Sequence, residues 1–245
     1  QTAHADPHCR MLRPLTATAT TSEGNDQIID NSAYTCTIVS MLLERPLAVV
    51  TPTVDGDVLT VLARADASFT PPQVQEILHR HSVAGVRKTL NRLVEQGIVD
   101  AARVGNAVNY RLNRDHLAAQ SIIELANLRN VLFDWIREHV EAWSPPPRLA
   151  MLFGSAATGT MRADSDIDLF VVGNDQDLDH DAWQAQVGEL ERAVSRWTGN
   201  DARILEYSVS DLDHPTDPVV DDIRRDGIVI SGDRSLLTRN RRRTS

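Results

Sequence analysis

Apolar residues recur every three or four positions in three short runs near the start of the patterned sequence. The runs cover residues 58–62, 74–78 and 86–94, and each predicts an amphipathic helix. Thr70, directly before two prolines, is typical of a helix N-cap, and Ser82 holds the same place before the third run. The pattern therefore predicts three short helices in succession.

The period changes after the third helix. Residues 98–112 alternate in character around a Gly105-Asn106 turn, which indicates a β-hairpin. Residues 115–143 return to helical spacing and predict one long amphipathic helix. Three prolines at 145–147 cannot continue a helix and form a stiff spacer. We expect a connector helix that is buried against its own chain, or that also serves a dimer.

The remaining sequence mixes strand and helix patterns, so the fold class is α+β, with a mixed sheet and flanking helices at its C-terminal end. The predicted elements there are a strand over 149–153, a short helix, a strand through 166–172, a helix over 182–197, a strand over 202–208, a helix from 218 and a strand over 228–230.

Five regions follow from these patterns. Residues 1–40 are polar and without period, which predicts disorder. The chain begins at Gln1, so this stretch is expected to be an extension, with Met41 as the natural start. The expected regions are an extension over 1–45, a helical domain with its hairpin over 46–113, the connector over 114–144, a second domain over 148–233 and a basic tail over 234–245.

Composition narrows the setting and the partners. The two cysteines, Cys9 and Cys36, match no metal-binding or disulfide spacing, which favours a reducing, cytoplasmic compartment. No apolar run approaches the roughly 18 residues of a membrane span, so no membrane partner is expected. Residues 51–112 carry a net charge of +1 and residues 148–238 carry −10. This asymmetry indicates two modules with different roles.

The strongest chemical signal lies at the start of the second domain. A strand runs into Gly154, which allows a sharp turn, and into Ser155 at the start of a helix, where a phosphate group is favoured. Asp166 and Asp168 are two residues apart on the next strand, so both carboxylates point to the same face. Two adjacent carboxylates repel each other unless a cation lies between them, and Mg²⁺ suits such ligands.

This arrangement resembles the polymerase-beta-like nucleotidyltransferase superfamily, whose signature is a Gly-Ser turn, a short helix and Asp-x-Asp on a strand. The resemblance covers residues 148–232. It implies a nucleoside triphosphate (NTP) as substrate, bound through Gly154 and Ser155, and two divalent ions, Mg²⁺ or Mn²⁺, held by Asp166 and Asp168. Arg162 would help to bind phosphate, or is a solvated surface arginine.

The superfamily also implies a third carboxylate from a later strand. The aligned position falls near Arg203, and Glu206 lies on the opposite strand face from it. Glu206 is the expected third catalytic acid if the register differs or a bulge intervenes. Asp201, before the strand, is the poorer candidate.

The helical domain resembles bacterial winged helix-turn-helix regulators, in which the third helix reads DNA. Val86, Leu90, Leu93 and Val94 form the buried stripe. The residues off that stripe, with Arg103 on the hairpin, are the candidate contacts to double-stranded DNA: Ser82, Arg87, Lys88, Asn91, Arg92 and Arg103. The alternative is a winged helix used for protein contacts or dimerisation, because a charge of +1 is weak for DNA binding.

Two hypotheses of function follow. The first is a Mg²⁺-dependent nucleotidyltransferase that moves a nucleotidyl group from NTP to a hydroxyl of a protein, an RNA or a small molecule, coupled to a DNA-binding winged helix and present as a homodimer. The second is a DNA-binding transcriptional regulator or antitoxin-like protein whose transferase domain has lost catalysis and senses nucleotide. The position of Glu206 or Arg203 beside Asp166 and Asp168 discriminates between them.

Overall fold

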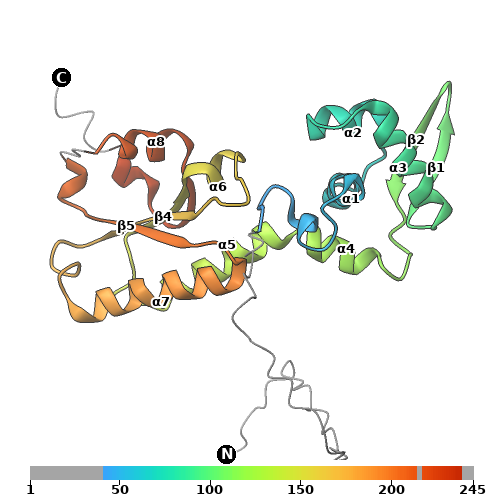
Figure 1. Cartoon of the computed structure of the whole chain (residues 1–245). Coiled ribbons are helices and arrows are strands. Elements are labelled where there is room, and N and C mark those ends of the chain that lie inside the picture. The colour runs from blue at the N-terminus through green and yellow to red at the C-terminus, as the bar shows by residue number, and fades with distance from the viewer. Residues whose placement is uncertain (1–40, 214–216, 239–245) are drawn as a thin grey trace, which may run out of the picture. The chain divides into compact units, whose positions relative to one another are not determined.

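The computed structural model describes residues 41–213 and 217–238, without the side chain of Asp213 (Figure 1). The disorder expected over 1–40, both cysteines and the last seven residues of the expected tail lie outside the described residues. No helix in the described ranges combines the length and apolar character needed to span a membrane.

Three helices and a hairpin form the first part, in the predicted order. The elements are η2 (Pro46–Val49), α1 (Val54–Arg64), α2 (Pro71–Leu78), α3 (Val83–Glu95), β1 (Val99–Val104) and β2 (Ala107–Leu112).

Local hydrogen bonds explain where these helices begin. At α2, the Thr70 amide donates to Gln73 Oε1 at 2.8 Å, which forms a capping box. At α3, the Ser82 hydroxyl accepts from the Gly85 amide at 3.1 Å. The N-caps predicted at Thr70 and Ser82 are therefore confirmed.

One apolar core holds the helices and the hairpin together. Val58, Leu62, Val74 and Leu90 are fully buried in it. The hairpin joins this core through Tyr110 of β2, whose backbone exchanges two 2.8 Å hydrogen bonds with Phe69 in the loop before α2. The loop before α2 is therefore fixed to the hairpin by backbone pairing.

The predicted single connector helix is wrong, because the structure contains two helices, α4 (Ala119–Ala126) and α5 (Leu128–Glu141). Asn127 separates them with φ −96° and ψ 2°, and its side-chain oxygen accepts from Asn130 Nδ2 at 2.6 Å. Asparagine interrupts helices because its side chain offers local alternatives to the regular ladder. The two helices also belong to different cores: α4 packs with α1, and α5 packs on the C-terminal sheet.

The second part is built on a mixed four-stranded sheet, as predicted. Its strand order is β5-β4-β3-β6, with β4 and β5 parallel and the other neighbours antiparallel. The elements are β3 (Leu149–Phe153), α6 (Gly154–Thr158), β4 (Ile167–Gly173), α7 (Asp181–Thr198), β5 (Ala202–Ser208), η3 (Asp211–Asp213), α8 (Val219–Asp226), β6 (Ile228–Gly232) and η4 (Arg234–Leu237).

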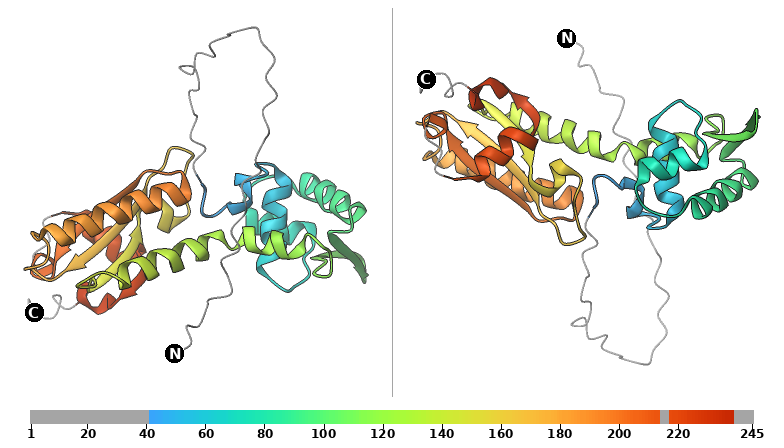
Figure 2. Two further views of the ribbon diagram at one scale, coloured as in Figure 1. Left: turned by 90° about the horizontal axis from the view of Figure 1, so that it is seen from below. Right: turned by 90° about the horizontal axis from the view of Figure 1, so that it is seen from above.

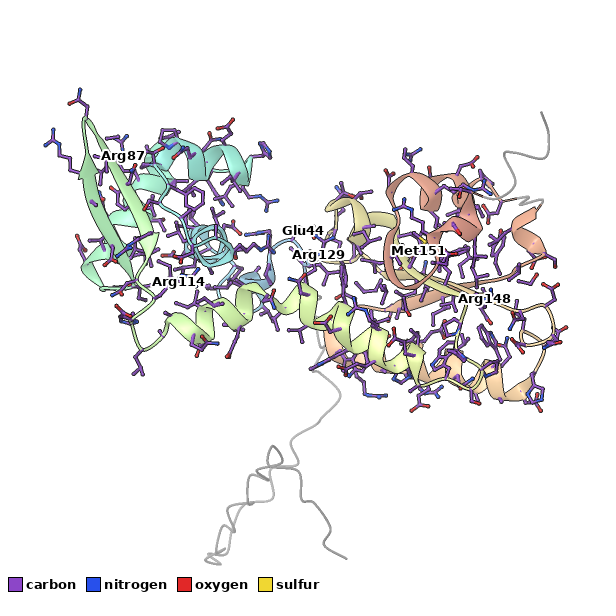
Figure 3. All side chains as sticks on the ribbon, turned by 180° about the vertical axis from the view of Figure 1, so that it is seen from behind. Glu44, Arg87, Arg114, Arg129, Arg148 and Met151 are labelled. Atoms are coloured by element: carbon purple, nitrogen blue, oxygen red, sulfur yellow. The ribbon has the colours of Figure 1, made fainter. Side chains whose placement is uncertain are left out.

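Helices cover both faces of this sheet. Figure 2 shows α5 and α7 side by side on one face, where Ile167 and Leu169 are buried. The other face carries α8, η3 and η4, which cover Phe170 and Met151 (Figure 3). Alternate residues of β4 therefore enter two separate apolar layers. Asp168 lies on the same face of the strand as Phe170.

Both ends of the described chain pack into cores that lie outside the domain bounds expected from the sequence. Met41 and Leu43, placed in the expected extension, are buried in the core between the sheet and α5/α7. The Met41 amide donates to Asn200 Oδ1 at 2.9 Å. Leu236 and Leu237, placed in the expected tail, are buried under the opposite face. Short apolar segments at the domain edges pack because each contributes buried area, although neither is long enough to show a period.

Candidate functional site

The turn between β3 and α6 places Gly154 against the carboxylate of Asp168. Gly154 has φ +67°, a conformation that favours glycine. A Cβ atom at this position would overlap with Oδ2 of Asp168. Backbone and carboxylate therefore approach more closely than any other residue type at 154 would permit.

Ser155 follows in the first turn of the five-residue helix α6. Its side chain is partly exposed, as are those of Asp166 and Asp168. Arg162 lies in the loop after α6 with an exposed side chain, and its amide donates to the Ser165 hydroxyl at 2.8 Å. The structure thus places Gly154 and Ser155 beside the acidic strand, while Arg162 lies on the connecting loop.

Asp168 is the second residue of β4, and Asp166 directly precedes the strand. The charge of Asp166 acts on Asp168, so the two carboxylates lie near each other. Asp168 lies opposite Phe153, the last residue of β3, in the antiparallel register. The pKa of Asp168 is raised by burial and by the neighbouring charge of Asp166, and the charge of Arg203 opposes this shift. Because its pKa is raised, the ionised carboxylate of Asp168 is disfavoured in this structure, and a bound cation would stabilise it.

Arg203 of β5 occupies the position beside the pair. The parallel register places Arg203 next to Asp168, and Nη1 of Arg203 lies 2.9 Å from Oδ2 of Asp166. The Arg203 side chain is 71% exposed, whereas that of Asp166 is 24% exposed. The cation paired with Asp166 in this structure is therefore the guanidinium of a largely solvent-exposed arginine.

Glu206 does not join the carboxylate pair, because the β4–β5 pairing contains neither the register change nor the bulge that would bring it to that face. The β4–β5 pairing is continuous from Ile167 to Gly173, and Glu206 keeps the strand parity opposite to Arg203. Its carboxylate faces α7, where it accepts from Trp183 Nε1 at 2.5 Å and Gln184 Nε2 at 3.2 Å. The expectation that Glu206 joins the site is corrected by this geometry.

Asp166 and Asp168 can hold a divalent cation, but they supply only part of its ligands. Within residues 41–213 and 217–238, no three His, Cys, Asp or Glu side chains are grouped closely enough to hold a metal ion. Asp166 and Asp168 supply two carboxylates, which suffices for Mg²⁺ when substrate phosphates and water complete its shell. Asp201, the poorer candidate, adds no third ligand.

The candidate DNA contacts divide into two groups. Arg87, Lys88 and Arg103 have exposed side chains on α3 and the hairpin. Among these, Arg103 Nε donates to the Gly105 carbonyl at 3.4 Å. The other three have partners elsewhere in the fold: Ser82 caps α3, Asn91 Oδ1 accepts from the Tyr110 hydroxyl at 2.8 Å, and Arg92 forms an ion pair with Asp55.

A groove connects α3 to the tip of the hairpin. Arg87 and Asn91 line it together with residues 106–108 of the hairpin and Tyr110. The sequence reasoning missed Tyr110, although its place opposite Ala101 in a half-buried hairpin is the signal that would have placed it inward.

Comparison with known proteins identifies the second part. Residues 140–234 match the family model described as polymerase beta, nucleotidyltransferase. The C-terminal half therefore carries a polymerase beta-like nucleotidyltransferase domain. No curated protein matches the chain.

Two solved structures are similar over part of the chain. One is a toxin–antitoxin complex with AMP-PNP, at 20% identity and a TM-score of 0.35, covering 45% of this chain and 84% of that one. The other is a mutant of the toxin–antitoxin pair MntA–HpeT, at 18% identity and a TM-score of 0.34, with the same coverage.

Proposed function

We propose that the polymerase beta-like domain of this chain transfers a nucleotidyl group from an NTP to an acceptor hydroxyl, with Mg²⁺ or Mn²⁺ held by Asp166 and Asp168. One observation carries the proposal. Asp166 and Asp168 lie together at the start of β4, where the charge of Asp166 acts on Asp168, and the backbone turn at Gly154 is pressed against Asp168. A metal–triphosphate complex requires both features in one place, carboxylates for the ion and open backbone for the phosphates.

Each residue has a defined task in this proposal. Gly154 keeps the turn free of side-chain atoms, and Ser155 contacts the triphosphate from the first turn of α6. Asp166 and Asp168 hold the divalent ion, which neutralises phosphate charge when bound. Arg162 lies on the exposed loop between the two motifs, where it contacts phosphate.

The reaction class follows from the groups that are bound. The acceptor oxygen forms a bond to the α-phosphorus, and the bond from that phosphorus to the departing oxygen breaks, so pyrophosphate leaves. The hydroxyl proton passes to solvent, since Glu206 faces α7 rather than the site. The acceptor is a hydroxyl of a protein, an RNA or a small molecule.

The test uses the full chain with α-labelled NTPs, Mg²⁺ and a cell lysate. Transfer of label and release of pyrophosphate are expected with the wild type and abolished in the double variant Asp166→Asn/Asp168→Asn. Glu206→Gln is the matched control, because it removes a carboxylate of the same domain from the opposite sheet face. The absence of label and pyrophosphate with every NTP contradicts the proposal.

For residues 46–113, we propose a winged helix-turn-helix that binds double-stranded DNA through α3 and the hairpin. The order of three helices and a hairpin supports this assignment, as do the exposed Arg87 and Lys88 on one side of α3. We expect binding to weaken steeply with salt, because each phosphate contact releases counterions. Fluorescence anisotropy with duplex DNA checks this on the full chain, comparing Arg87→Ala/Lys88→Ala with Arg111→Ala, whose side chain is paired with Asp100.

A second candidate function is a DNA-binding regulator that binds nucleotide without transferring it. The ion pair of Arg203 with Asp166 favours this candidate, because it puts a positive charge where the superfamily resemblance implies a third acid. Nucleotide binding by calorimetry, together with the absence of label transfer, would support it over the transferase. A nucleotide-dependent change in DNA affinity would complete that support.

A further inference from the structure

We infer that the Asp166–Asp168 site takes a single divalent ion, and that Arg203 supplies the positive charge that a second ion would otherwise bring. The inference rests on the proposed binding of a metal–triphosphate complex and specifies its composition. It differs from the two ions that the superfamily resemblance implies for these two carboxylates.

The backbone fixes Arg203 beside the pair. β5 runs parallel to β4 without interruption, and the pairing sets Arg203 next to Asp168 while its guanidinium contacts Asp166. Because residues at the same level of adjacent strands stay about 5 Å apart, Arg203 cannot leave this neighbourhood without breaking the sheet. Its long side chain can still change partner, because most of it is exposed to solvent.

Charge limits the number of ions. Asp166, Asp168 and Arg203 together carry one net negative charge, whereas three carboxylates at these positions would carry three. One divalent ion then leaves the group at +1, and a second would leave it at +3 before any phosphate arrives. Ions of a two-metal site lie only about 4 Å apart, so this surplus is concentrated in a small volume.

No other described acid can compensate. Glu206 is the nearest carboxylate along β5 after Arg203, and it is held on the opposite face by the indole of Trp183. Trp183 is 1% exposed, so release of Glu206 would leave a buried N–H group without its acceptor. Among the residues that the structure describes, no third acidic or histidine ligand lies with the pair.

Arg203 has a second use once an ion is present. When an ion binds Asp166, the guanidinium loses its partner and remains next to the site on an exposed stem. Guanidinium groups bind phosphate oxygens with two parallel hydrogen bonds, so the released Arg203 pairs with the triphosphate. The same side chain therefore pairs with Asp166 without nucleotide and contacts the nucleotide when it is bound.

The experiment counts ions. The full chain is titrated with Mn²⁺ in the presence of a non-hydrolysable NTP analogue, and bound Mn²⁺ is measured by electron paramagnetic resonance. We expect one ion per chain for wild type and two for Arg203→Asp. Arg203→Gln, which removes the charge without adding a ligand, is expected to tighten Mn²⁺ binding without nucleotide by about tenfold, because the competing cation is gone. Arg192→Asp, an equal charge change at an exposed position of α7, is expected to leave the count at one.

The outcomes separate this inference from the proposed function. Two ions bound to the wild type overturn the inference and leave the transferase proposal standing. An unchanged Mn²⁺ affinity in Arg203→Gln, with the variant folded by circular dichroism, also overturns it. Absence of Mn²⁺ and nucleotide binding in the wild type contradicts both. Weaker binding of the NTP analogue by Arg203→Gln, measured at saturating Mn²⁺, supports the phosphate contact.

Discussion

Nη1 of Arg203 lies 2.9 Å from Oδ2 of Asp166, and this ion pair links β5 to the residue that directly precedes β4. An arginine so placed affects both carboxylates of the pair. Its charge opposes the increase in the pKa of Asp168 that burial and Asp166 cause.

Removal of that charge therefore has a predictable direction. In Arg203→Gln, we expect the pKa of Asp168 to rise above its wild-type value, because only the causes that raise it remain. Carboxyl ¹³C shifts followed against pH measure this directly. Arg192→Gln on α7 is the control, and an equal or lower pKa of Asp168 in Arg203→Gln would contradict the effect of the Arg203 charge on Asp168.

Gly154→Ala is expected to abolish nucleotide binding and to destabilise the fold. The added Cβ meets the Asp168 carboxylate, and φ +67° is strained for alanine. We expect about 3 kcal/mol of destabilisation, measured by urea unfolding. Gly159→Ala is the matched control: its φ is +73°, but no atom lies within 4 Å of an added Cβ. It should show only the backbone cost of about 1 kcal/mol, with nucleotide binding retained.

Glu206→Ala tests the structural role assigned to that carboxylate. The variant leaves the buried Trp183 N–H without its acceptor, so a loss of about 1–3 kcal/mol of stability is expected. Mn²⁺ and nucleotide affinities should stay at wild-type values. A loss of metal binding in a folded Glu206→Ala protein would restore Glu206 as a member of the site.

A buried acid in the helical domain predicts how stability depends on pH. Asp57 is 3% exposed and accepts from Arg45 at 2.8 and 3.0 Å and from His81 Nε2 at 2.7 Å. Burial acts to raise the pKa of Asp57, but the hydrogen bonds from Arg45 and His81 and the charge of Arg45 lower it overall. Since the folded pKa lies below the unfolded one, the stabilisation is complete above the unfolded pKa of about 3.9 and is lost as pH falls through the folded value.

Asp57→Asn is therefore expected to destabilise the protein at neutral pH by about 1–3 kcal/mol, because the partly buried Arg45 loses its ionised partner. The acid branch of the stability curve should flatten. Thermal unfolding from pH 2 to 8 measures both effects. Asp100→Asn, which breaks the exposed pair with Arg111, should change stability by less than about 1 kcal/mol.

Local patterns predicted much of this structure. The helices α2 and α3 begin at Thr70 and Ser82, which form local capping hydrogen bonds. The Gly105-Asn106 turn sets the hairpin register. Strand alternation predicted that Asp166 and Asp168 lie close together, although β4 begins at Ile167, between them. Each of these depends on interactions within a few residues, which sequence periodicity records.

The structure differs from the sequence-based predictions where long-range packing decides the outcome. The break at Asn127 reflects a change of partner from α1 to the sheet, which a continuous apolar stripe in the sequence does not reveal. The fate of Glu206 depends on Trp183, which approaches it from α7, 23 residues away in sequence. Arg203 was aligned with the site from sequence, but its ion pair with Asp166 depends on the pairing of β4 with β5.

Met41 and Leu43 have a consequence for the topology of the chain. Both pack in the core that α5 and the sheet complete, whereas the core of the three helices and hairpin is drawn from residues 47–126. Along the chain, the helical domain therefore lies between two segments that pack in the core of the C-terminal sheet, which the chain leaves after Leu43 and rejoins at Leu128. A domain tethered at both ends cannot be removed by truncation from either terminus without also stripping part of the host core. Deletion of residues 47–126, with a short loop joining the ends, would remove the helical domain and keep Met41 and Leu43 in the core of the C-terminal sheet.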